Sequence, residues 1–427
     1  MRRRLLAAAA LLVLAAGGAA IAYYLHVKHA SRDIQGSPTV EFVPTQTVAP
    51  AVTREPDVPW PMYGHDAERL RVAAGVTLEP PFHPIWTFRA QSLVEFPPAV
   101  AYGRLYFGTN SGRVIAIGAA NGLKAWSYDS HRCEAASPAV DRHLVFQVFL
   151  NVPPCNRPNS SSLTGELVAF AAGSGSVVWR RAIGPSETSP AVAHGIVYVG
   201  DWNGRVSAFA AGTGKLWWST QLHGEVKGGV AVVGSRVYAA DYSSHVYALS
   251  ARTGRIVWES SAQPRFGSTG TFYATPAVAY DRVYVGATDG KMYSFGEATG
   301  ELRWSTSTGG YVYSSAAVWH QRVFAGSYSH EFFCFDAASG RVLWQFHADG
   351  PISGSPTVVA GRVYFATLAG TTYALDAVTG RQVWTYPDGK YSPVVADTKR
   401  LYLTGYARLY GLVPQRRTAK RAVPSNP

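Results

Sequence analysis

The chain of 427 residues is poor in charge, because Asp, Glu, Lys and Arg make up only 15% of it. It has only three cysteines and three methionines, whereas aromatic residues reach 13% and glycine occurs 42 times. This composition argues against long helices and against disorder, and it favours many short strands joined by tight turns. A chain of this length can hold two or three average domains or one repeat domain.

The net positive charge is small between the two ends of the chain, although the formal net charge of the whole is +12. Three of these charges come from the arginines at 2–4, and four come from the tail after residue 415. About five remain for the residues between, which is too few for a basic stripe that could bind nucleic acid. We therefore expect no nucleic-acid partner.

One long apolar run, Leu5 to Leu25, opens the chain after the arginines. It is long enough to cross a bilayer as a helix, and the arginines favour a cytoplasmic N-terminus. We predict that residues 1–30 are a single-pass anchor at the cell membrane, with the remainder on the extracytoplasmic side. The alternative is a cleaved signal peptide, which makes the protein secreted or periplasmic. Residues 31–59 contain five prolines and are predicted to be an extended linker.

A short phrase, exemplified by "AVTGRQVW" ending at Trp384, occurs seven times: a small or polar residue, Gly, three residues and Trp. Successive copies are 39 to 53 residues apart, which indicates a repeat architecture. Within one period, residues 190–193, 196–200, 205–210 and 215–220 alternate apolar and polar positions between Gly-containing turns. Four antiparallel strands, A to D, that recur about every 40 residues predict the blades of a β-propeller.

The two ends of the repeat region predict how the ring closes. The last copy has three strands and no Trp, whereas "PIWTF" supplies an extra strand upstream of the first complete blade. We predict an all-β, eight-bladed propeller at residues 60–414, closed by pairing of the chain ends, and a basic disordered tail at 415–427. Each blade has one structural Trp that covers the joint with its neighbour, and these are Trp86, Trp126, Trp179, Trp218, Trp258, Trp304, Trp344 and Trp384.

The Gly-x-x-x-Trp corner, preceded by "VYAL" or "TYALD", resembles the repeat of the pyrroloquinoline-quinone (PQQ) enzyme family. Residues 60–71, "WPMYGHDAERLR", resemble the segment that precedes the first blade in this superfamily. In size and blade number the chain is most similar to the BamB-type outer-membrane assembly factors, which bind proteins. The resemblance implies a membrane-tethered, protein-binding scaffold of the cell envelope, with an envelope protein or polymer as partner.

Another branch of the superfamily comprises quinoprotein dehydrogenases, which hold PQQ and Ca²⁺ in the central channel. Those enzymes place two adjacent cysteines against the quinone, whereas Cys133, Cys155 and Cys334 are all apart in this sequence. The chain also lacks the long insertions of those enzymes. We therefore expect a protein that is not an enzyme and needs no cofactor. The alternative is a PQQ- and Ca²⁺-dependent dehydrogenase or a cofactor-binding sensor.

Two insertions stretch the repeat, at residues 149–165 in blade 2 and 262–273 before blade 5. Both fall on the face that carries the B–C and D–A connections, which we call the mouth face. Functional loops gather on one side of a rigid scaffold, so we expect this face to bind the partner. Cys133 and Cys155 lie in blade 2 on the mouth face and predict a disulfide. Cys334 occupies an alanine position of the repeat and is predicted to be buried.

Aligned repeats place one residue of each blade just before strand A, where it would ring the channel. These residues are Glu95, Ala135, Glu187, Lys227, Tyr273, Tyr313, Ser353 and Lys390. Opposite charges on adjacent blades predict the ion pairs Glu187–Lys227 and Glu95–Lys390. Trp202, Tyr242 and Tyr328, in B–C loops, would form the rim. Two interpretations stay open: ion pairs that neutralise a narrow, wet channel, or a polar and aromatic pocket for a ligand or a partner side chain.

Other chemical motifs are absent from the sequence. The twelve histidines show no metal-ligand spacing, and "GTGKLW" lacks the frame of a phosphate-binding loop. No catalytic or metal residues are predicted, and we expect a monomeric propeller.

Overall fold

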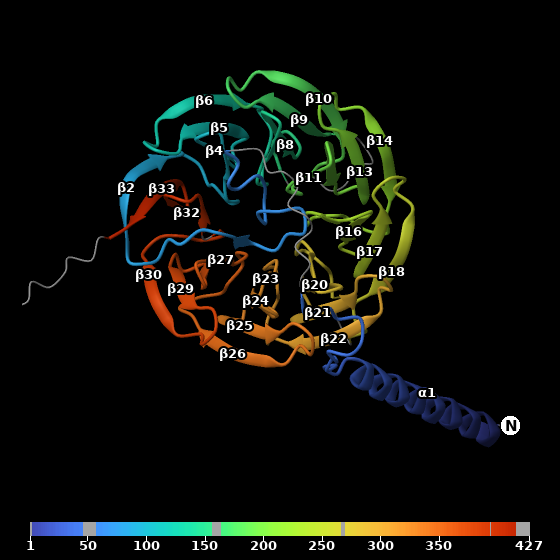
Figure 1. The fold of residues 1–427 in the computed structure, drawn as a ribbon. Coiled ribbons are helices and arrows are strands. Elements are labelled where there is room, and N and C mark those ends of the chain that lie inside the picture. The colour runs from blue at the N-terminus through green and yellow to red at the C-terminus, as the bar shows by residue number, and fades with distance from the viewer. Residues whose placement is uncertain (1, 46–56, 156–163, 266–269, 393, 416–427) are drawn as a thin grey trace, which may run out of the picture.

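The computed structural model describes residues 2–45, 57–155, 164–265, 270–392 and 394–415, with side chains from residue 12 onward. Eight sheets stand side by side around one axis and close into a ring (Figure 1). Each has four antiparallel strands, and the sheet of blade 7 also carries β1 (Val72–Ala73) as a fifth. The prediction of an all-β, eight-bladed propeller is confirmed.

The strands A to D follow one another from the axis outward in every blade. In the order of blades 1 to 8, strand A is β3 (Ala99–Ala101), β7 (Ala139–Asp141), β11 (Ala191–Ala193), β15 (Ala231–Val233), β19 (Ala277–Ala279), β23 (Ala317–Trp319), β27 (Thr357–Val359) and β31 (Val394–Ala396). Strand B is β4 (Arg104–Gly108), β8 (Leu144–Phe149), β12 (Ile196–Gly200), β16 (Arg236–Ala240), β20 (Arg282–Gly286), β24 (Arg322–Gly326), β28 (Arg362–Ala366) and β32 (Leu401–Thr404). Strand C is β5 (Arg113–Gly118), β9 (Gly165–Ala171), β13 (Arg205–Ala210), β17 (His245–Ser250), β21 (Lys291–Gly296), β25 (Glu331–Asp336), β29 (Thr372–Asp376) and β33 (Arg408–Pro414). Strand D is β6 (Lys124–Asp129), β10 (Val177–Ile183), β14 (Leu216–Gln221), β18 (Ile256–Ser261), β22 (Leu302–Ser307), β26 (Val342–His347), β30 (Gln382–Tyr386) and β2 (Phe82–Arg89).

The ring closes in blade 8, where the two ends of the repeat region pair. β2, from the N-terminal side, pairs antiparallel with β33 near the C-terminus, and Trp86 lies opposite Gly411. β33 in turn pairs with β32, so the blade has its full four strands. This pairing satisfies two sheet edges that an open ring would leave exposed.

The repeated phrase forms the joints between neighbouring blades. Trp126 on strand D of blade 1 donates its indole N–H to the carbonyl of Ala172 in blade 2, at 2.9 Å. The corner glycine of blade 2 faces the same ring, because a Cβ on Gly175 would lie only 2.5 Å from Trp126. The same bond to the following blade is made by Trp86, Trp179, Trp218, Trp258 and Trp304. The Gly and the Trp of one phrase therefore serve two successive joints, which explains why they recur together.

The lead-in, residues 60–73, runs inside the ring (Figure 1). Its backbone bonds to strand A of successive blades: Trp60 to blade 1, Pro61 to blade 2, Ala67 to blade 4, Glu68 to blade 5, Leu70 to blade 6 and Arg71 to blade 7. β1 then pairs in parallel with β27. The chain thus fills its own channel, unlike the narrow, wet channel that the sequence led us to consider.

The N-terminal helix α1 (Arg2–Ala30) extends away from the ring (Figure 1). Our prediction of a single-pass anchor is wrong, because no helix among the described residues is long and apolar enough to cross a membrane. The described side chains of α1, residues 12–30, include six Ala and two Gly among Leu, Val and Ile, and polar His26, Lys28 and His29 near the end of the helix. Ala and Gly are less apolar than the Leu, Ile and Phe that favour insertion. The predicted location at the cell membrane and the predicted membrane contact are overturned with the anchor.

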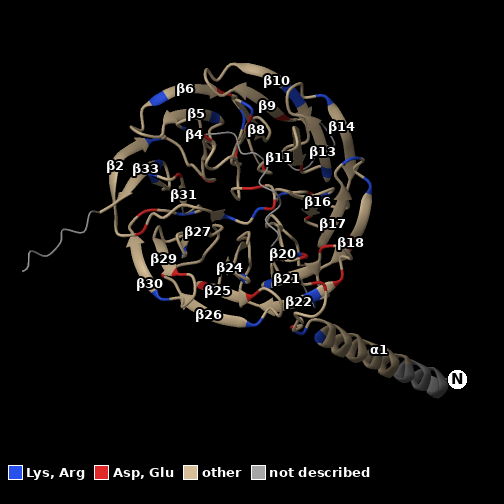
Figure 2. Ribbon diagram, viewed as in Figure 1, with Lys and Arg blue, Asp and Glu red and all other residues tan. Residues whose placement is uncertain are grey.

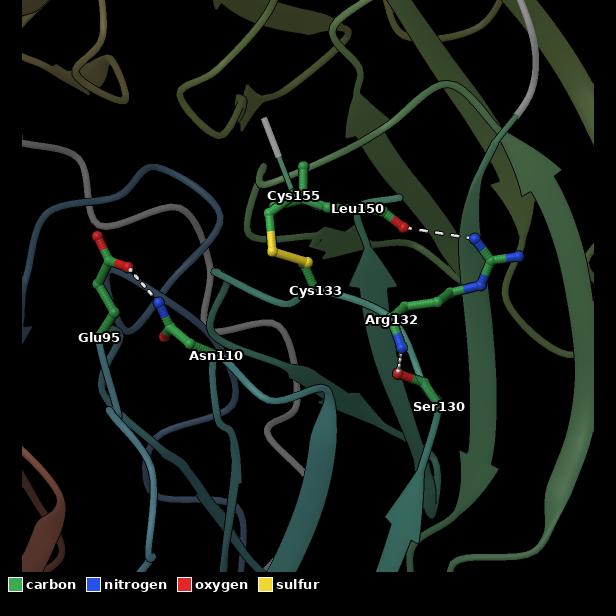
Figure 3. Close-up of a disulfide and its surroundings, with 7 residues drawn as sticks. All are labelled: Glu95, Asn110, Ser130, Arg132, Cys133, Leu150 and Cys155. Carbon is green, nitrogen blue, oxygen red and sulfur yellow. Dashed lines mark hydrogen bonds between the residues drawn. A yellow bond between two sulfur atoms is a disulfide. The ribbon is translucent and has the colours of Figure 1, made fainter. Parts of the chain in front are cut away.

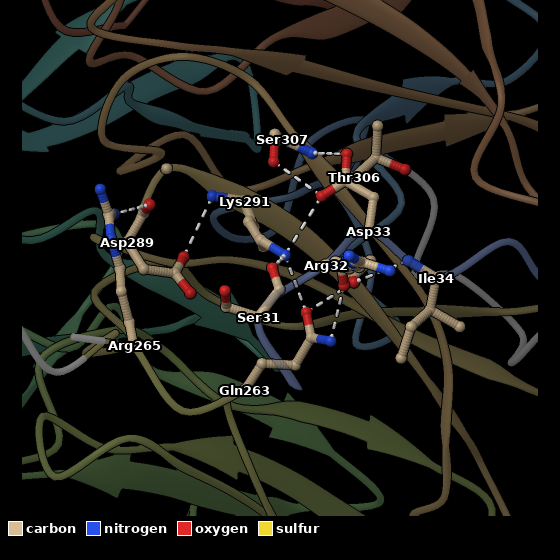
Figure 4. Close-up of polar contacts among 12 residues, drawn as sticks. Ser31, Arg32, Asp33, Ile34, Gln263, Arg265, Asp289, Lys291, Thr306 and Ser307 are labelled. Carbon is tan, nitrogen blue, oxygen red and sulfur yellow. Dashed lines mark hydrogen bonds and ion pairs between the residues drawn. The ribbon is translucent and has the colours of Figure 1, made fainter. Parts of the chain in front are cut away.

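Residues 31–45 lie against blade 5, which differs from the extended linker that we expected. Asp33 accepts hydrogen bonds from the backbone N–H and the hydroxyl of Ser307, and its carboxylate lies 3.1 Å from Lys291 Nζ (Figure 4). Farther along, Glu41 accepts a hydrogen bond from Arg303 Nε at 3.1 Å. Two acidic residues in a segment with no regular structure therefore fasten it to two basic residues of one blade. Residues 46–56 and most of the predicted tail, 416–427, lie outside the described residues.

Candidate functional site

The mouth of the channel holds a small cavity of about 20 Å³. Glu187, Lys227, Tyr273 and Tyr313, each just before strand A of its blade, line this cavity together with Tyr63 of the lead-in. The repeat alignment predicted that these positions ring the channel, and four of them, from consecutive blades, line one cavity. A cavity of this size has room for about one water molecule, so it suits a single polar group.

Glu187 is the half-buried acid that lines the cavity. Its carboxylate accepts hydrogen bonds from Trp202 Nε1 at 3.0 Å and from the Tyr273 hydroxyl at 3.3 Å. Burial raises the pKa of Glu187 to about 7, although the charge of Lys227 and the bond from Trp202 act in the opposite direction. A proton on this carboxylate can therefore come and go near neutral pH.

Lys227 does not form the predicted direct ion pair with Glu187. Its Nζ lies 3.1 Å from a carboxylate oxygen of Glu225, two residues earlier in the same connection. The same Nζ lies 4.9 Å from the ring centre of Trp202 and 4.5 Å from that of Tyr242, in cation–π geometry. Lys227 is thus held between two predicted rim residues by a local carboxylate, and it acts on Glu187 through space.

The second predicted pair, Glu95 with Lys390, is not formed either. Glu95 accepts a hydrogen bond from Asn110 Nδ2 at 3.3 Å, and burial raises its pKa. Lys390 Nζ lies over the rings of Tyr391 and Tyr406 instead. Among the described residues, no ion pair joins the two predicted partners. Lys390 therefore contacts two aromatic rings, where the sequence predicted a contact with the Glu95 carboxylate.

Blades 1 to 3 contribute three acids, the half-buried Glu95 and Glu187 and the buried Glu134, which we call the carboxylate arc. Glu134 was not predicted, because the alignment assigned the ring position of blade 2 to its neighbour Ala135. It accepts hydrogen bonds from Ala136 N at 2.6 Å and Gln147 Nε2 at 2.8 Å. Burial, together with the charge of Glu95, raises the pKa of Glu134 to about 8, although both hydrogen bonds act in the opposite direction.

Blades 5 and 6 contribute Tyr273, Tyr313 and Tyr328, which we call the tyrosine arc. The ring of Tyr313 lies edge-on to that of Tyr273 and that of Tyr328, with centres 5.1 Å apart in both pairs. The ring of Tyr242, from blade 4, lies 6.4 Å from Tyr273 and continues the series. Burial raises the pKa of Tyr313 to about 12 and raises that of Tyr273 as well, so these two hydroxyls stay uncharged at neutral pH. Its hydroxyl groups and ring edges present a rigid, amphipathic surface.

Tyr63 forms the floor of the cavity, and sequence reasoning gave it no role. Its hydroxyl lies 2.9 Å from Ser355 Oγ, and the Arg71 guanidinium stacks 3.8 Å from its ring centre. Arg69 of the same lead-in is fully buried and donates to backbone carbonyls of Ser189 and Val230. These arginines bind carbonyl groups and an aromatic ring, partners that have no sequence signature. Only the placement of the lead-in inside the ring reveals them.

The predicted disulfide between Cys133 and Cys155 is confirmed and lies beside the mouth (Figure 3). Cys133 exchanges backbone hydrogen bonds with Leu150 and Asn151, and it packs in a small apolar cluster that includes Phe96 and Trp202. The disulfide therefore supports the wall of the cavity from the side of blade 2. Cys334 is a free, buried cysteine in strand C of blade 6, as expected. Residues 156–163 of the blade 2 insertion and 266–269 of the other lie outside the described residues.

Charges of both signs are distributed around the ring, without a continuous basic stripe in this view (Figure 2). The buried charges of the mouth are therefore local features of the site and do not belong to a wider charged surface. Recognition at the mouth would depend on hydrogen bonding and aromatic contact more than on long-range steering.

Comparison with known proteins places this architecture. A family model described as outer membrane protein assembly factor BamB matches residues 83–150, 163–316 and 307–415. No curated protein matches the chain. Among solved structures, BamB from Moraxella catarrhalis is 16% identical, with a TM-score of 0.62 over 80% of this chain and 100% of that chain.

Two enzymes have the same fold. A quinohemoprotein alcohol dehydrogenase from Comamonas testosteroni is 14% identical, with a TM-score of 0.70 over 87% of this chain and 82% of that one. A europium-containing methanol dehydrogenase is 14% identical, with a TM-score of 0.68 over 87% and 99%. Identities this low show the fold alone, whereas the family model covers most of the sequence. The chain therefore belongs to the PQQ-repeat propeller family whose model is described as outer membrane protein assembly factor BamB.

Proposed function

We propose that this chain is a protein-binding scaffold whose contact surface is the mouth face, centred on the cavity between Glu187, Lys227 and the tyrosine arc. The observation that carries the proposal is the lead-in, which fills the channel and leaves a cavity of only about 20 Å³ at the mouth. A cavity of that size suits one side chain group of a partner. The aromatic rim around it has the composition of a protein-binding hot spot.

A PQQ-dependent dehydrogenase is the alternative function, and the residues at the mouth do not fit that cofactor. Sites for small molecules of this kind enclose about 300–1,000 Å³, more than ten times the volume available here. Tyr63 lines the cavity, and the backbone of the lead-in bonds to the inner strands of six blades, so the chain itself takes up space inside the ring. No two cysteines are adjacent in the sequence. These features support a binding role over redox catalysis.

The partner that fits best is a protein segment with a polar or basic side chain flanked by apolar ones. Glu187 and the tyrosine hydroxyls offer hydrogen-bond acceptors and donors inside the cavity. The exposed ring of Tyr311 lies 6.0 Å from that of Tyr313 beside the cavity, and Tyr406 exposes a second ring on the mouth face. Tyrosines lose little conformational entropy on binding, because they are already held edge to edge. The family description, which names a protein assembly factor, agrees with a protein partner.

Photo-crosslinking in cells that produce the chain tests the proposed face. A photoreactive residue is placed at Tyr311, on the mouth face, or at Val378, in a C–D corner on the opposite face. Both side chains are 52% exposed, so they sample solvent equally. We expect one defined polypeptide adduct from position 311, diminished by Glu187→Gln or Lys227→Met, and none from position 378.

Equal adducts from both positions, or adducts unaffected by the cavity variants, would contradict the proposed surface. A carbohydrate adduct at position 311 would replace the protein by an envelope polymer as partner. A separate titration of the purified chain with PQQ and Ca²⁺ tests the alternative. Stoichiometric binding at micromolar cofactor, with dye reduction, would overturn the scaffold proposal.

A further inference from the structure

Three side chains that could bind a metal converge on the mouth face where blades 3 and 4 meet, away from the cavity. His223 follows β14 of blade 3, His245 begins β17, and Glu259 lies on β18 of blade 4. One ligand atom from each lies within 4.8 Å of the other two. These residues are 14 to 36 positions apart in the sequence, so no motif spacing revealed them.

The separations of these atoms suit a tetrahedral ion. Nε2 of His223 lies 3.7 Å from one oxygen of Glu259, and Nε2 of His245 lies 3.5 Å from the other. A tetrahedral zinc ion with bonds of about 2.0–2.2 Å separates its ligand atoms by about 3.3–3.6 Å. Three single ligand atoms that lie within 4.8 Å of one another are therefore close to these separations, and rotation of the side chains is the adjustment that an ion would require.

The backbone around both histidines is already fixed. The Asp241 carboxylate accepts a hydrogen bond from the N–H of Gly224, next to His223, at 2.9 Å, and from the N–H of His245 at 3.0 Å. One buried acid thereby ties the two histidine-bearing segments together. Tyr247 donates to the same carboxylate at 2.8 Å. Such preorganisation lowers the cost of bringing three ligands to one ion.

The imidazole of His245 is also oriented for metal binding. Its Nδ1 lies 3.1 Å from Ser243 Oγ, which leaves Nε2 facing Glu259. Metal-bound histidines characteristically use their other nitrogen in a hydrogen bond of this kind. Neighbouring blades lack the set: the positions equivalent to His245 are Arg205 in blade 3 and Lys291 in blade 5, which cannot serve as ligands at neutral pH.

We propose that His223, His245 and Glu259 bind one divalent transition-metal ion, preferentially Zn²⁺, across the joint between blades 3 and 4. Two imidazoles and one carboxylate match the ligand preferences of Zn²⁺ and disfavour Ca²⁺ and Mg²⁺, which require mostly oxygen ligands. The His223 side chain is 58% exposed, so a fourth position is open to water or to a group from a partner. The ion adds a clamp between blades that share no strand hydrogen bonds.

Isothermal titration of the full, tag-free chain with ZnCl₂ after removal of metals by a chelator tests the site. We expect one ion per chain, no comparable heat with CaCl₂, and a higher Tm with Zn²⁺ than without it. Ser243→Ala removes an orienting residue and should lower the zinc affinity by ~10–100-fold. His223→Ala and Glu259→Gln each remove a ligand and should lower the affinity by more than that. Co²⁺ in place of Zn²⁺ should give the visible absorption of a tetrahedral ion in the wild type and not in His223→Ala.

His347→Ala is the matched control. His347 lies on the mouth face of blade 6, paired with Glu331 at 2.8 Å, and belongs to no three-ligand group among the described residues. It should leave zinc affinity unchanged. His223 and Glu259 are partly exposed, so their variants should fold, which circular dichroism verifies. No binding at 100 μM Zn²⁺ (about −5.5 kcal/mol in binding free energy), or binding that the two ligand variants do not weaken, would overturn the site.

Discussion

The two arcs of the mouth come from different blades of the ring and differ in what they require of the fold. The carboxylate arc of blades 1–3 contains three acids with raised pKa values, of which Glu134 is fully buried, whereas the tyrosine arc of blades 5 and 6 contains half-buried phenol rings. A buried carboxylate destabilises the fold once it ionises, and a buried tyrosine does not at neutral pH. The mouth therefore has a side whose acids respond to pH and a side whose tyrosines do not respond at neutral pH.

The difference indicates how the mouth is divided in use. The disulfide and the hydrogen bonds of Glu134 stiffen the carboxylate side, where the acids need a fixed environment. The tyrosine side is held largely by ring-to-ring packing, with one hydrogen bond from Tyr273 to Glu187, and it exposes Tyr311 to solvent. We expect the tyrosine arc to supply contact area to a partner and the carboxylate arc to supply selectivity.

The largest expected effect on stability comes from the disulfide, which lies on the carboxylate side of the mouth. Replacing both Cys133 and Cys155 by Ser should lower the free energy of unfolding by about 3 kcal/mol, because the bond closes a loop of 22 residues. Urea denaturation measures the change. A reducing agent should destabilise the wild type by a similar amount and leave the double variant unchanged. Equal stability of the oxidised and reduced wild type would remove the disulfide from the comparison.

The next effect concerns the acid with the highest pKa of the arc. Glu134 titrates near 4.5 when unfolded and near 8 when folded, so the folded state binds the extra proton between these values. The stability due to this group is therefore complete below pH 4.5 and is lost as the pH rises through 8. Glu134→Gln keeps both hydrogen-bond acceptor roles without the charge. It should be more stable than the wild type at pH 9 by on the order of 2 kcal/mol, as chemical denaturation measures.

Glu79→Gln is the control for this pH dependence, since Glu79 is 62% exposed and pairs only loosely with Arg362. Its unfolding profile should follow that of the wild type from pH 5 to 9. A Glu134→Gln variant with an unchanged pH profile would mean that Glu134 is not buried as a neutral acid.

The smallest effect distinguishes the two arcs where they meet. Tyr273→Phe removes the hydroxyl that donates to Glu187, which should cost about 1 kcal/mol at pH 8 and raise the pKa of Glu187 further. The matched variant Tyr313→Phe lies in the tyrosine arc without a bond to a carboxylate. It should leave the pH dependence of stability unchanged. The same pH dependence in both variants would contradict the division into arcs.

The blades and their joints could be predicted from the sequence because each repeat has the same pair of contacting residues, a Gly and a Trp. Gly175 and Trp126 show why: one residue needs the absence of a Cβ, and the other needs a large flat ring. The closure of the ring followed from a missing strand. The lead-in could not be placed in the same way, because its backbone bonds to the backbone of the inner strands, and such bonds leave no residue pattern.

The site was predictable in position and not in pairing. The repeat alignment brought Glu187, Lys227 and Tyr273 to one cavity, since equivalent positions of a propeller converge on the axis. The alignment did not predict the ion pairs correctly. Lys227 pairs with Glu225, two residues away in the same connection, and not with Glu187 of the neighbouring blade. The anchor was predicted from the length of the apolar run at the N-terminus. The run contains many Ala and Gly residues, and no helix among the described residues is apolar enough to cross a membrane.

Hydroxyl-radical footprinting of the chain, alone and bound to the polypeptide recovered by crosslinking, tests the scaffold account most directly. Three aromatic side chains serve as reporters with nearly equal exposure: Tyr311 at 52% and Tyr406 at 53% beside the mouth, and Trp217 at 55% on the outer strand β14. The account predicts that the partner protects Tyr311 and Tyr406 from oxidation and leaves Trp217 unchanged. Protection of Trp217 with no change at the two tyrosines would contradict it.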